Sequence, residues 1–159
     1  MLTYREILPS DNKILYDIII EIMKAYKPDL KGTIAEDPTV HTMYENFQKE
    51  KSVYYIVEED RKILGGAGLA QLDGTSENTC ELQRMFLLPE ARGKGIGSKL
   101  MEICLEAAKN FGYEKMYLET LSNMDEARKL YVKSGFELIP SPKGNTGHGG
   151  CNTFMERKL

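Results

Sequence analysis

The sequence has few cysteines, no long apolar run and no excess of positive charge. Its three cysteines, Cys80, Cys104 and Cys151, are odd in number and widely separated. This usage fits a reducing cytosol better than a disulfide scaffold, so we expect a cytoplasmic protein. No apolar stretch reaches the roughly 18–20 residues of a membrane span. The first residues lack the apolar stretch of a secretory signal, and we expect neither export nor a membrane partner.

The charge balance excludes a strongly basic nucleic-acid-binding protein. The chain has 21 Lys and Arg against 24 Asp and Glu, a net charge of −3. A local basic patch would still be compatible with this total, but aromatic residues are poorly interleaved with the basic ones, so no nucleic-acid partner is expected. The 159 residues, 42% apolar and 28% charged, predict a single domain over 1–159.

The spacing of apolar residues predicts the elements in the order β-α-α-β-β-β-α-β-α-β-β. Helical spacing runs over 14–26, 40–47, 98–111 and 125–134, with a helix cap expected at Ser10-Asp11. Strands are expected over 2–8, 52–58, 63–72, 79–88, 115–120, 136–139 and 152–158. Runs of strands with one clear strand–helix–strand crossover indicate an α/β or α+β layered sheet flanked by helices.

A glycine-rich segment joins an expected strand to an expected helix in the middle of the chain. It reads Glu81-Leu-Gln-Arg-Met-Phe-Leu-Leu-Pro-Glu-Ala-Arg-Gly-Lys-Gly-Ile-Gly97. Glycines let backbone N–H groups turn toward a ligand, and a helix N-terminus adds unpaired donors and the positive end of a dipole. Arg92 and Lys94 add positive charge. The segment therefore predicts a pyrophosphate-binding turn.

Two common phosphate-binding motifs do not match this segment. The Walker pattern G-x-x-x-x-G-K-[ST] is absent, and the glycines run G-x-G-x-G instead of the dinucleotide pattern G-x-G-x-x-G. Taken alone, the pattern leaves open a strand-to-helix turn that binds no ligand.

Two ordered motifs resemble one enzyme family. Arg92-Gly-Lys-Gly-Ile-Gly97 matches the acyl-CoA loop [QR]-x-x-G-x-[GA] of the Gcn5-related N-acetyltransferase family. The preceding Met85-Phe-Leu-Leu-Pro89 resembles that family's fourth strand. Downstream, Ala127-Arg-Lys-Leu-Tyr131-Val-Lys-Ser-Gly135-Phe136 resembles its signature A-x-x-L-Y-x-x-x-G-F. The element order also fits, so the resemblance covers nearly the whole sequence.

The resemblance implies a mixed, mostly antiparallel sheet and an acetyltransferase that uses acetyl-CoA as co-substrate. The fourth and fifth strands would separate, with the pantetheine lying between them. Its binding residues would come from the fourth strand and the glycine turn: Met85, Phe86, Leu87, Arg92, Gly93, Lys94, Gly95, Ile96, Gly97 and Ser98. The backbone N–H of Leu87 would stabilise the oxyanion of the thioester carbonyl.

Acetyl transfer to an amine requires a base, because the amine is protonated near pH 7. Glu81 is expected on the same strand face as Leu87, by two-residue alternation, and some family members carry their base at this position. Other members carry it near the end of the next strand, where Glu119 lies. The sequence does not choose between the two glutamates. Gln83 shares the face of Glu81 and is a candidate to orient a water.

Tyr131 occupies the tyrosine position of the signature, which in many family members protonates the CoA thiolate. A core tyrosine packed on the sheet is the alternative. The fuller motif has an asparagine three residues before Ala127, where this sequence has Met124. Asn123 lies one position earlier in the sequence. We expect it either to contact the cofactor or to cap the following helix.

The segment 140–150 before the last expected strand holds two prolines and four glycines. His148 and Cys151 lie in or beside it. A zinc site needs about four ligands, and the only other histidine is His41, so we expect no metal and interpret the segment as a flap over the acceptor pocket.

The sequence therefore predicts an N-acetyltransferase that moves an acetyl group from acetyl-CoA to a primary amine by direct attack in a ternary complex. The acceptor would be a small-molecule amine or a peptide amine. Two alternatives stay open: an acyl-CoA-binding sensor without turnover, and an acetyltransferase for protein N-termini or lysines. A homodimer is also compatible with the sequence.

Overall fold

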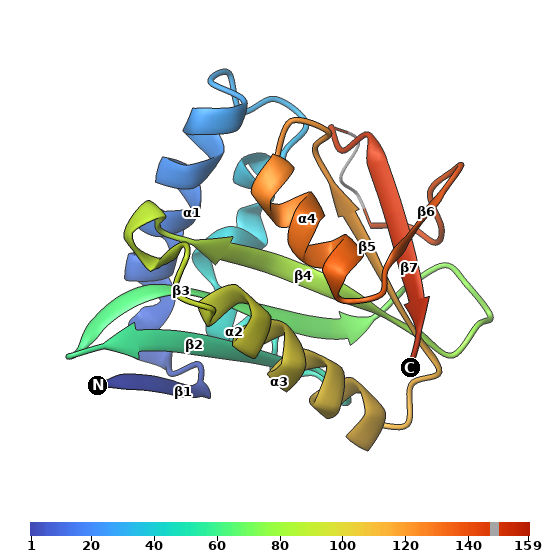
Figure 1. The fold of residues 1–159 in the computed structure, drawn as a ribbon, viewed down its shortest axis with the longest axis horizontal. Coiled ribbons are helices and arrows are strands. Elements are labelled where there is room, and N and C mark those ends of the chain that lie inside the picture. The colour runs from blue at the N-terminus through green and yellow to red at the C-terminus, as the bar shows by residue number, and fades with distance from the viewer. Residues whose placement is uncertain (147–149) are drawn as a thin grey trace.

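In the computed structural model, which describes residues 1–146 and 150–159, seven strands form one sheet in the order β1-β2-β3-β4-β5-β7-β6 (Figure 1). Only β4 and β5 pair in parallel, and the other neighbours are antiparallel. The expected mixed, mostly antiparallel sheet is confirmed. The strands are β1 (Leu2–Glu6), β2 (Val53–Glu59), β3 (Lys62–Gln71), β4 (Thr79–Leu87), β5 (Lys115–Thr120), β6 (Glu137–Ile139) and β7 (Thr153–Lys158).

Helices cover both faces of this sheet. In Figure 1, α3 (Ile96–Asn110) and α4 (Asp125–Lys133) lie on one face, and α1 (Asn12–Tyr26) and α2 (Met43–Asn46) lie on the other. The single helix expected over 40–47 is wrong. Thr42 has φ −126° and ψ 49°, and this non-helical residue separates a 3-10 turn, Pro38–His41, from the one-turn α2.

The start of α1 also differs in detail from the expectation. Asp11 does occupy the N-cap position, but its side chain makes no capping hydrogen bond to the helix. Its carboxylate instead accepts from the backbone N–H of Leu8 at 2.7 Å and from Arg5 at 2.8 Å. The carboxylate thereby joins β1 to the turn before α1.

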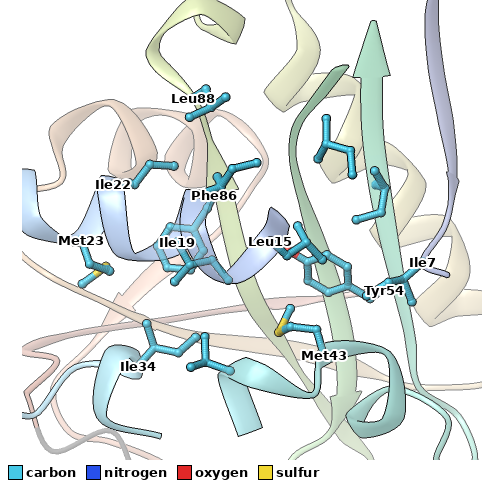
Figure 2. Packing of buried hydrophobic residues seen from close by; sticks show 14 of the residues in the cluster. Ile7, Leu15, Ile19, Ile22, Met23, Ile34, Met43, Tyr54, Phe86 and Leu88 are labelled. Carbon is cyan, nitrogen blue, oxygen red and sulfur yellow. The ribbon is translucent and has the colours of Figure 1, made fainter. Parts of the chain in front are cut away.

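Two apolar layers result, one on each face. Figure 2 shows the layer under α1, where Leu15, Ile19 and Ile22 pack toward Tyr54 of β2 and Phe86 of β4. The opposite layer lies between the sheet and α3 with α4, and it contains Cys80 and Cys104, both fully buried. Both cysteines are therefore core residues.

A bulge in β4 changes which face each side chain meets. The β3–β4 register advances two residues, from Gly66 to Gly68, while β4 advances three, from Gln83 to Phe86. Arg84 lies in the bulge with φ +56°. Before it, Glu81 and Gln83 face the side of α1; after it, Phe86 packs on that side and Leu87 packs on the side of α3. The expectation that Glu81 and Leu87 share a face is therefore wrong.

Tyr54 holds this bulge in place from two strands away. Its hydroxyl donates to the backbone carbonyl of Arg84 at 2.7 Å, and the residue is 1% exposed. The ring crosses β3 above Gly66 and Gly68, where an added Cβ would lie 2.6 Å from the ring in each case. These glycines are required because the ring occupies the space of their missing side chains.

After Glu81 and Tyr117, just before the bulge, β4 and β5 separate. Their pairing covers only three residue pairs, Thr79–Glu81 with Lys115–Tyr117, although both strands continue further (Figure 1). The diverging ends leave a backbone edge of β4 without a strand partner on that side. Among the described residues, no helix combines the length and the apolar character needed to cross a bilayer.

The Tyr54–Arg84 hydrogen bond yields a stability prediction. Tyr54→Phe keeps the ring but leaves a buried carbonyl unpaired, which costs about 1–3 kcal/mol. We expect this loss in the free energy of unfolding measured by urea denaturation. Tyr55→Phe is the control, because the half-buried Tyr55 makes no side-chain hydrogen bond within the described residues. Equal stabilities for the two variants would contradict the role given to Tyr54.

Candidate functional site

Two adjoining cavities open where β4 and β5 separate. The larger, of ≈ 450 Å³, runs between the edge of β4, the N-terminus of α3 and α4. The smaller, of ≈ 70 Å³, lies on the side of α1. Four residues line both cavities: Met85, Phe86, Met124 and Tyr131. A ligand in the larger cavity would therefore meet one in the smaller cavity at these side chains.

The glycine turn builds one end of the larger cavity. Gly93 and Gly95 have φ of +74° and +75°, and a Cβ added to either would meet no atom within 4 Å. Gly95 is the N-cap of α3 and supplies no capping side chain, so the first N–H groups of this helix lack intrahelical partners. Unpaired amides and open space at a helix N-terminus suit an anionic group such as a phosphate.

Most residues expected to bind the cofactor do line this larger cavity. Arg92 also approaches β4, where its guanidinium donates to the carbonyl of Leu87 at 3.5 Å. The expected residues found in the lining are Met85, Phe86, Leu87, Arg92, Gly93, Gly95, Ile96, Gly97 and Ser98.

Lys94 and Asn123 do not line it. The Lys94 ammonium lies 3.9 Å from a carboxylate oxygen of Glu59. The Asn123 amide donates to the carbonyl of Tyr26 at 3.0 Å, and α4 takes Met124 as its N-cap. Asn123 is therefore not a helix cap; it ties the end of α1 to the turn before α4.

Both flanking helices also contribute lining residues, which were not predicted from the sequence. Ile22 and Tyr26 come from α1, and Lys129 and Lys133 come from α4. Each pair is spaced four residues apart, which places both members on one helix face. Lys129 lies within the A-x-x-L-Y motif and Lys133 two residues after it, so their spacing could have indicated a shared helix face.

Glu81 lies in the smaller cavity and is 4% exposed. One of its carboxylate oxygens accepts a hydrogen bond from the Gln83 amide at 2.7 Å. Its other oxygen has no donor among the described residues. Burial raises the pKa of Glu81 to about 7, with a smaller upward contribution from Glu119 and an opposing one from Gln83. The group is thus able to take and return a proton near neutral pH.

Glu119 lines the same cavity, but both of its oxygens are engaged. One accepts from the hydroxyl of Tyr117 at 2.6 Å and the other from the hydroxyl of Thr146 at 2.8 Å. The Tyr117 hydroxyl in turn accepts from the backbone N–H of Lys143 at 3.0 Å. Glu119 therefore anchors the segment before β7, whereas one oxygen of Glu81 meets no donor in the part of the chain that the structure describes.

Tyr131 stands at the junction of the two cavities and is 6% exposed. Its ring packs edge-on against Phe136, with centroids 6.1 Å apart. Its hydroxyl makes no hydrogen bond within the described part of the chain. Burial raises the pKa of this phenol, so the group stays protonated and able to donate.

Cys151 also lines the smaller cavity, and burial raises the pKa of its thiol to about 11. The thiol is therefore neutral near pH 7 and a poor nucleophile. His148 lies outside the described residues. Within 1–146 and 150–159, no group of three or more His, Cys, Asp or Glu side chains is arranged to hold a metal ion.

Comparison with known proteins agrees with this geometry. The model of the Acetyltransferase (GNAT) family matches residues 16–136. The uncharacterized N-acetyltransferase YjgM of Escherichia coli K12 is 35% identical over 156 residues, covering 98% of this chain and 93% of that protein.

Two solved structures share the fold. A GNAT-family acetyltransferase from Staphylococcus aureus Mu50 superposes with a TM-score of 0.88 at 22% identity, covering 100% of this chain and 99% of that one. The putative acetyltransferase yncA from Salmonella typhimurium, solved with its cofactor acetyl-CoA, gives a TM-score of 0.74 at 20% identity, covering 99% and 94%.

The buried Glu81 predicts an unusual pH dependence of stability. Its pKa is about 7 in the folded chain and about 4.5 in the unfolded one, so the folded state binds more protons between these values. The free energy of unfolding should therefore fall as pH rises from 5 to 8, by about 2–3 kcal/mol from this group. Urea unfolding of Glu81→Gln should lack that fall, and the exposed Glu106→Gln should parallel the wild type. Parallel curves for all three proteins would contradict the raised pKa.

Proposed function

Because this chain belongs to the acetyltransferase (GNAT) family, we propose that it transfers an acetyl group from acetyl-CoA to a primary amine by direct attack within a ternary complex. The observation that carries the proposal is the meeting of the two cavities at Tyr131. The larger cavity has the features that suit an acyl-CoA, and the smaller one offers a carboxylate with a pKa near neutrality.

The larger cavity matches the parts of CoA in order. The N–H groups at the start of α3, with the open space at Gly93 and Gly95, suit the pyrophosphate. Lys129 and Lys133 supply positive charge along the same groove. The unpartnered edge of β4 beyond Glu81 suits the amides of a pantetheine arm, which would add to the sheet as an extra strand does.

Glu81 is the group we assign to deprotonate the acceptor amine. A base works best when its pKa lies near the working pH. Glu81 has such a pKa, lines the smaller cavity and keeps one oxygen without a donor among the described residues. Glu119 is assigned to positioning, because its two oxygens already hold Tyr117 and Thr146. The choice between the glutamates thus rests on hydrogen bonds that span distant parts of the sequence.

We assign Leu87 and Tyr131 to contacts with the reacting thioester. The backbone N–H of Leu87 would face the negative charge that develops on the thioester oxygen. Tyr131 would give its hydroxyl proton to the departing sulfur, because it lies at the junction of the cavities, keeps its proton and has no competing acceptor within the described residues.

The cofactor assignment predicts the effect of charge at the glycine turn. Acetyl-CoA should raise the melting temperature of the wild type, as any ligand of the folded state does. Gly95→Glu should abolish the rise, because a carboxylate would enter the space proposed for the pyrophosphate. Gly112→Glu is a matched control, since Gly112 also has a positive φ and open space but lies beyond the far end of α3. A normal shift in Gly95→Glu would remove the cofactor assignment.

The assignment of Glu81 as the base predicts that substitutions of the two glutamates have different effects on the reaction rate. With an amine found by screening amines, amino acids and peptides, Glu81→Gln should lower kcat by about 10²–10⁴. The rise of kcat/KM with pH near 7 should disappear in that variant and persist in Glu119→Gln. Release of CoA thiol measures both rates. No thiol release with any amine, although acetyl-CoA binds, would instead favour a binding module without acetyl transfer.

A further inference from the structure

Acidic side chains outnumber basic ones around the smaller cavity. Three charged side chains line it: the carboxylates of Glu81 and Glu119 and the guanidinium of Arg84. The remainder of the lining is mostly apolar, from Met23, Ile34, Leu82, Met85, Phe86, Leu118, Leu121 and Met124. The sign of charge that this cavity accepts therefore depends on whether Arg84 is available to a ligand.

Arg84 is not available, because both of its terminal nitrogens are already engaged. One donates to the carbonyl of Thr39 at 3.3 Å and contacts the sulfur of Met43 at 3.0 Å. The other pairs with Asp37 at 3.2 Å and donates to the Thr39 hydroxyl. Arg84 is 8% exposed, and its charge is paired with the partly exposed carboxylate of Asp37. The guanidinium therefore stabilises the loop that contains Thr39 and Asp37.

The two carboxylates face the cavity from neighbouring strands. Glu81 pairs in register with Tyr117, and Glu119 follows two residues later on β5, on the same face. Glu81 is buried and keeps one oxygen without a donor among the described residues. Asp73 adds negative potential at Glu81. Lys27 is a further cation near the site; it acts on Cys151 and does not line the cavity.

From these contacts we propose that the acceptor is a short aliphatic amine without a carboxylate, and that a second ammonium group on it strengthens binding. This inference rests on the proposed acetyl transfer and specifies its substrate class. One amine would lie at the free oxygen of Glu81, and the second charge would be attracted by Glu119. The apolar lining would contact the methylene groups between them.

A carboxylate on the acceptor is disfavoured for two reasons. It would lie beside two acids in a cavity of low polarity, where repulsion between like charges is strong. It would also leave water without gaining a free cationic partner, because Arg84 is committed to Asp37. Free amino acids, with a carboxylate beside the amine, should accordingly be poor acceptors.

Three amines with the same four-carbon skeleton test the proposal: 1,4-diaminobutane, 1-aminobutane and 4-aminobutanoate. They differ only at the far end, which is cationic, neutral or anionic. We expect kcat/KM to fall in that order, by about tenfold at each step. Each step changes the charge at the far end of the amine by one unit, and in a partly buried site the attraction or repulsion by Glu119 changes accordingly. Glu119→Gln should bring the first two amines close to equal, whereas Glu106→Gln, on the exposed face of α3, should preserve the ratio.

Specific outcomes would overturn the acceptor class. Turnover of 4-aminobutanoate equal to or above that of 1-aminobutane would contradict the proposed acceptor class. If Lys27→Met also abolished the turnover of 4-aminobutanoate, Lys27 would be the residue that binds its carboxylate. Acetylation of an α-amino acid in preference to all three would also contradict that class, while leaving acetyl transfer intact. Failure to acetylate any amine, with acetyl-CoA still raising the melting temperature, would contradict the proposed function itself.

Discussion

The hydrogen bond from Tyr54 to the carbonyl of Arg84 is the constraint on which the rest of the site depends. It fixes an extra residue in β4, and a bulge bends its strand and increases the local twist. The bulge lies directly after the last β4–β5 pair, Glu81↔Tyr117, and the two cavities occupy the space that opens where the strands separate. The same extra residue turns the Arg84 side chain toward Asp37 and Thr39, so one irregularity shapes the backbone edge and one wall of the smaller cavity.

The site divides its electrostatics between the two cavities. The larger one presents helix N–H groups, Arg92 and two lysines of α4 against a single carboxylate, Glu126, which pairs with one of these lysines; this excess of positive charge favours an anionic ligand. The smaller one presents Glu81 and Glu119, which favour a cationic ligand. Tyr131, neutral and buried, stands between them. Opposite potentials on the two sides would bring an anionic donor and a cationic acceptor together from opposite directions.

The sequence predicted the elements and the glycine turn because both depend on local patterns. The order of the elements along the chain, the approximate start of α3 and the lining of the larger cavity by Met85–Leu87 and the glycine turn follow from periodicity, turn chemistry and two motifs. The bulge could not be predicted, because Arg84 has a positive φ without the glycine, asparagine or aspartate that usually marks one. The distinction between Glu81 and Glu119 required the contact of Thr146 with Glu119, 27 positions away in the sequence. Such pairings leave no trace in local spacing.

The position of β7 has a consequence for the order in which the protein becomes structured. This strand inserts between β5 and β6 and pairs with β5 along six residues, from Lys115↔Lys158 to Thr120↔Thr153. During synthesis, which proceeds from the N-terminus, β5 and its Glu119 therefore remain an open sheet edge until residues 153–158 leave the ribosome. The layer under α1, built from residues up to 121, can form before then. The wall of the smaller cavity that β5 forms is thus completed last. A ribosome stalled before β7 would carry a nascent domain with an ordered core, an exposed strand and no finished site.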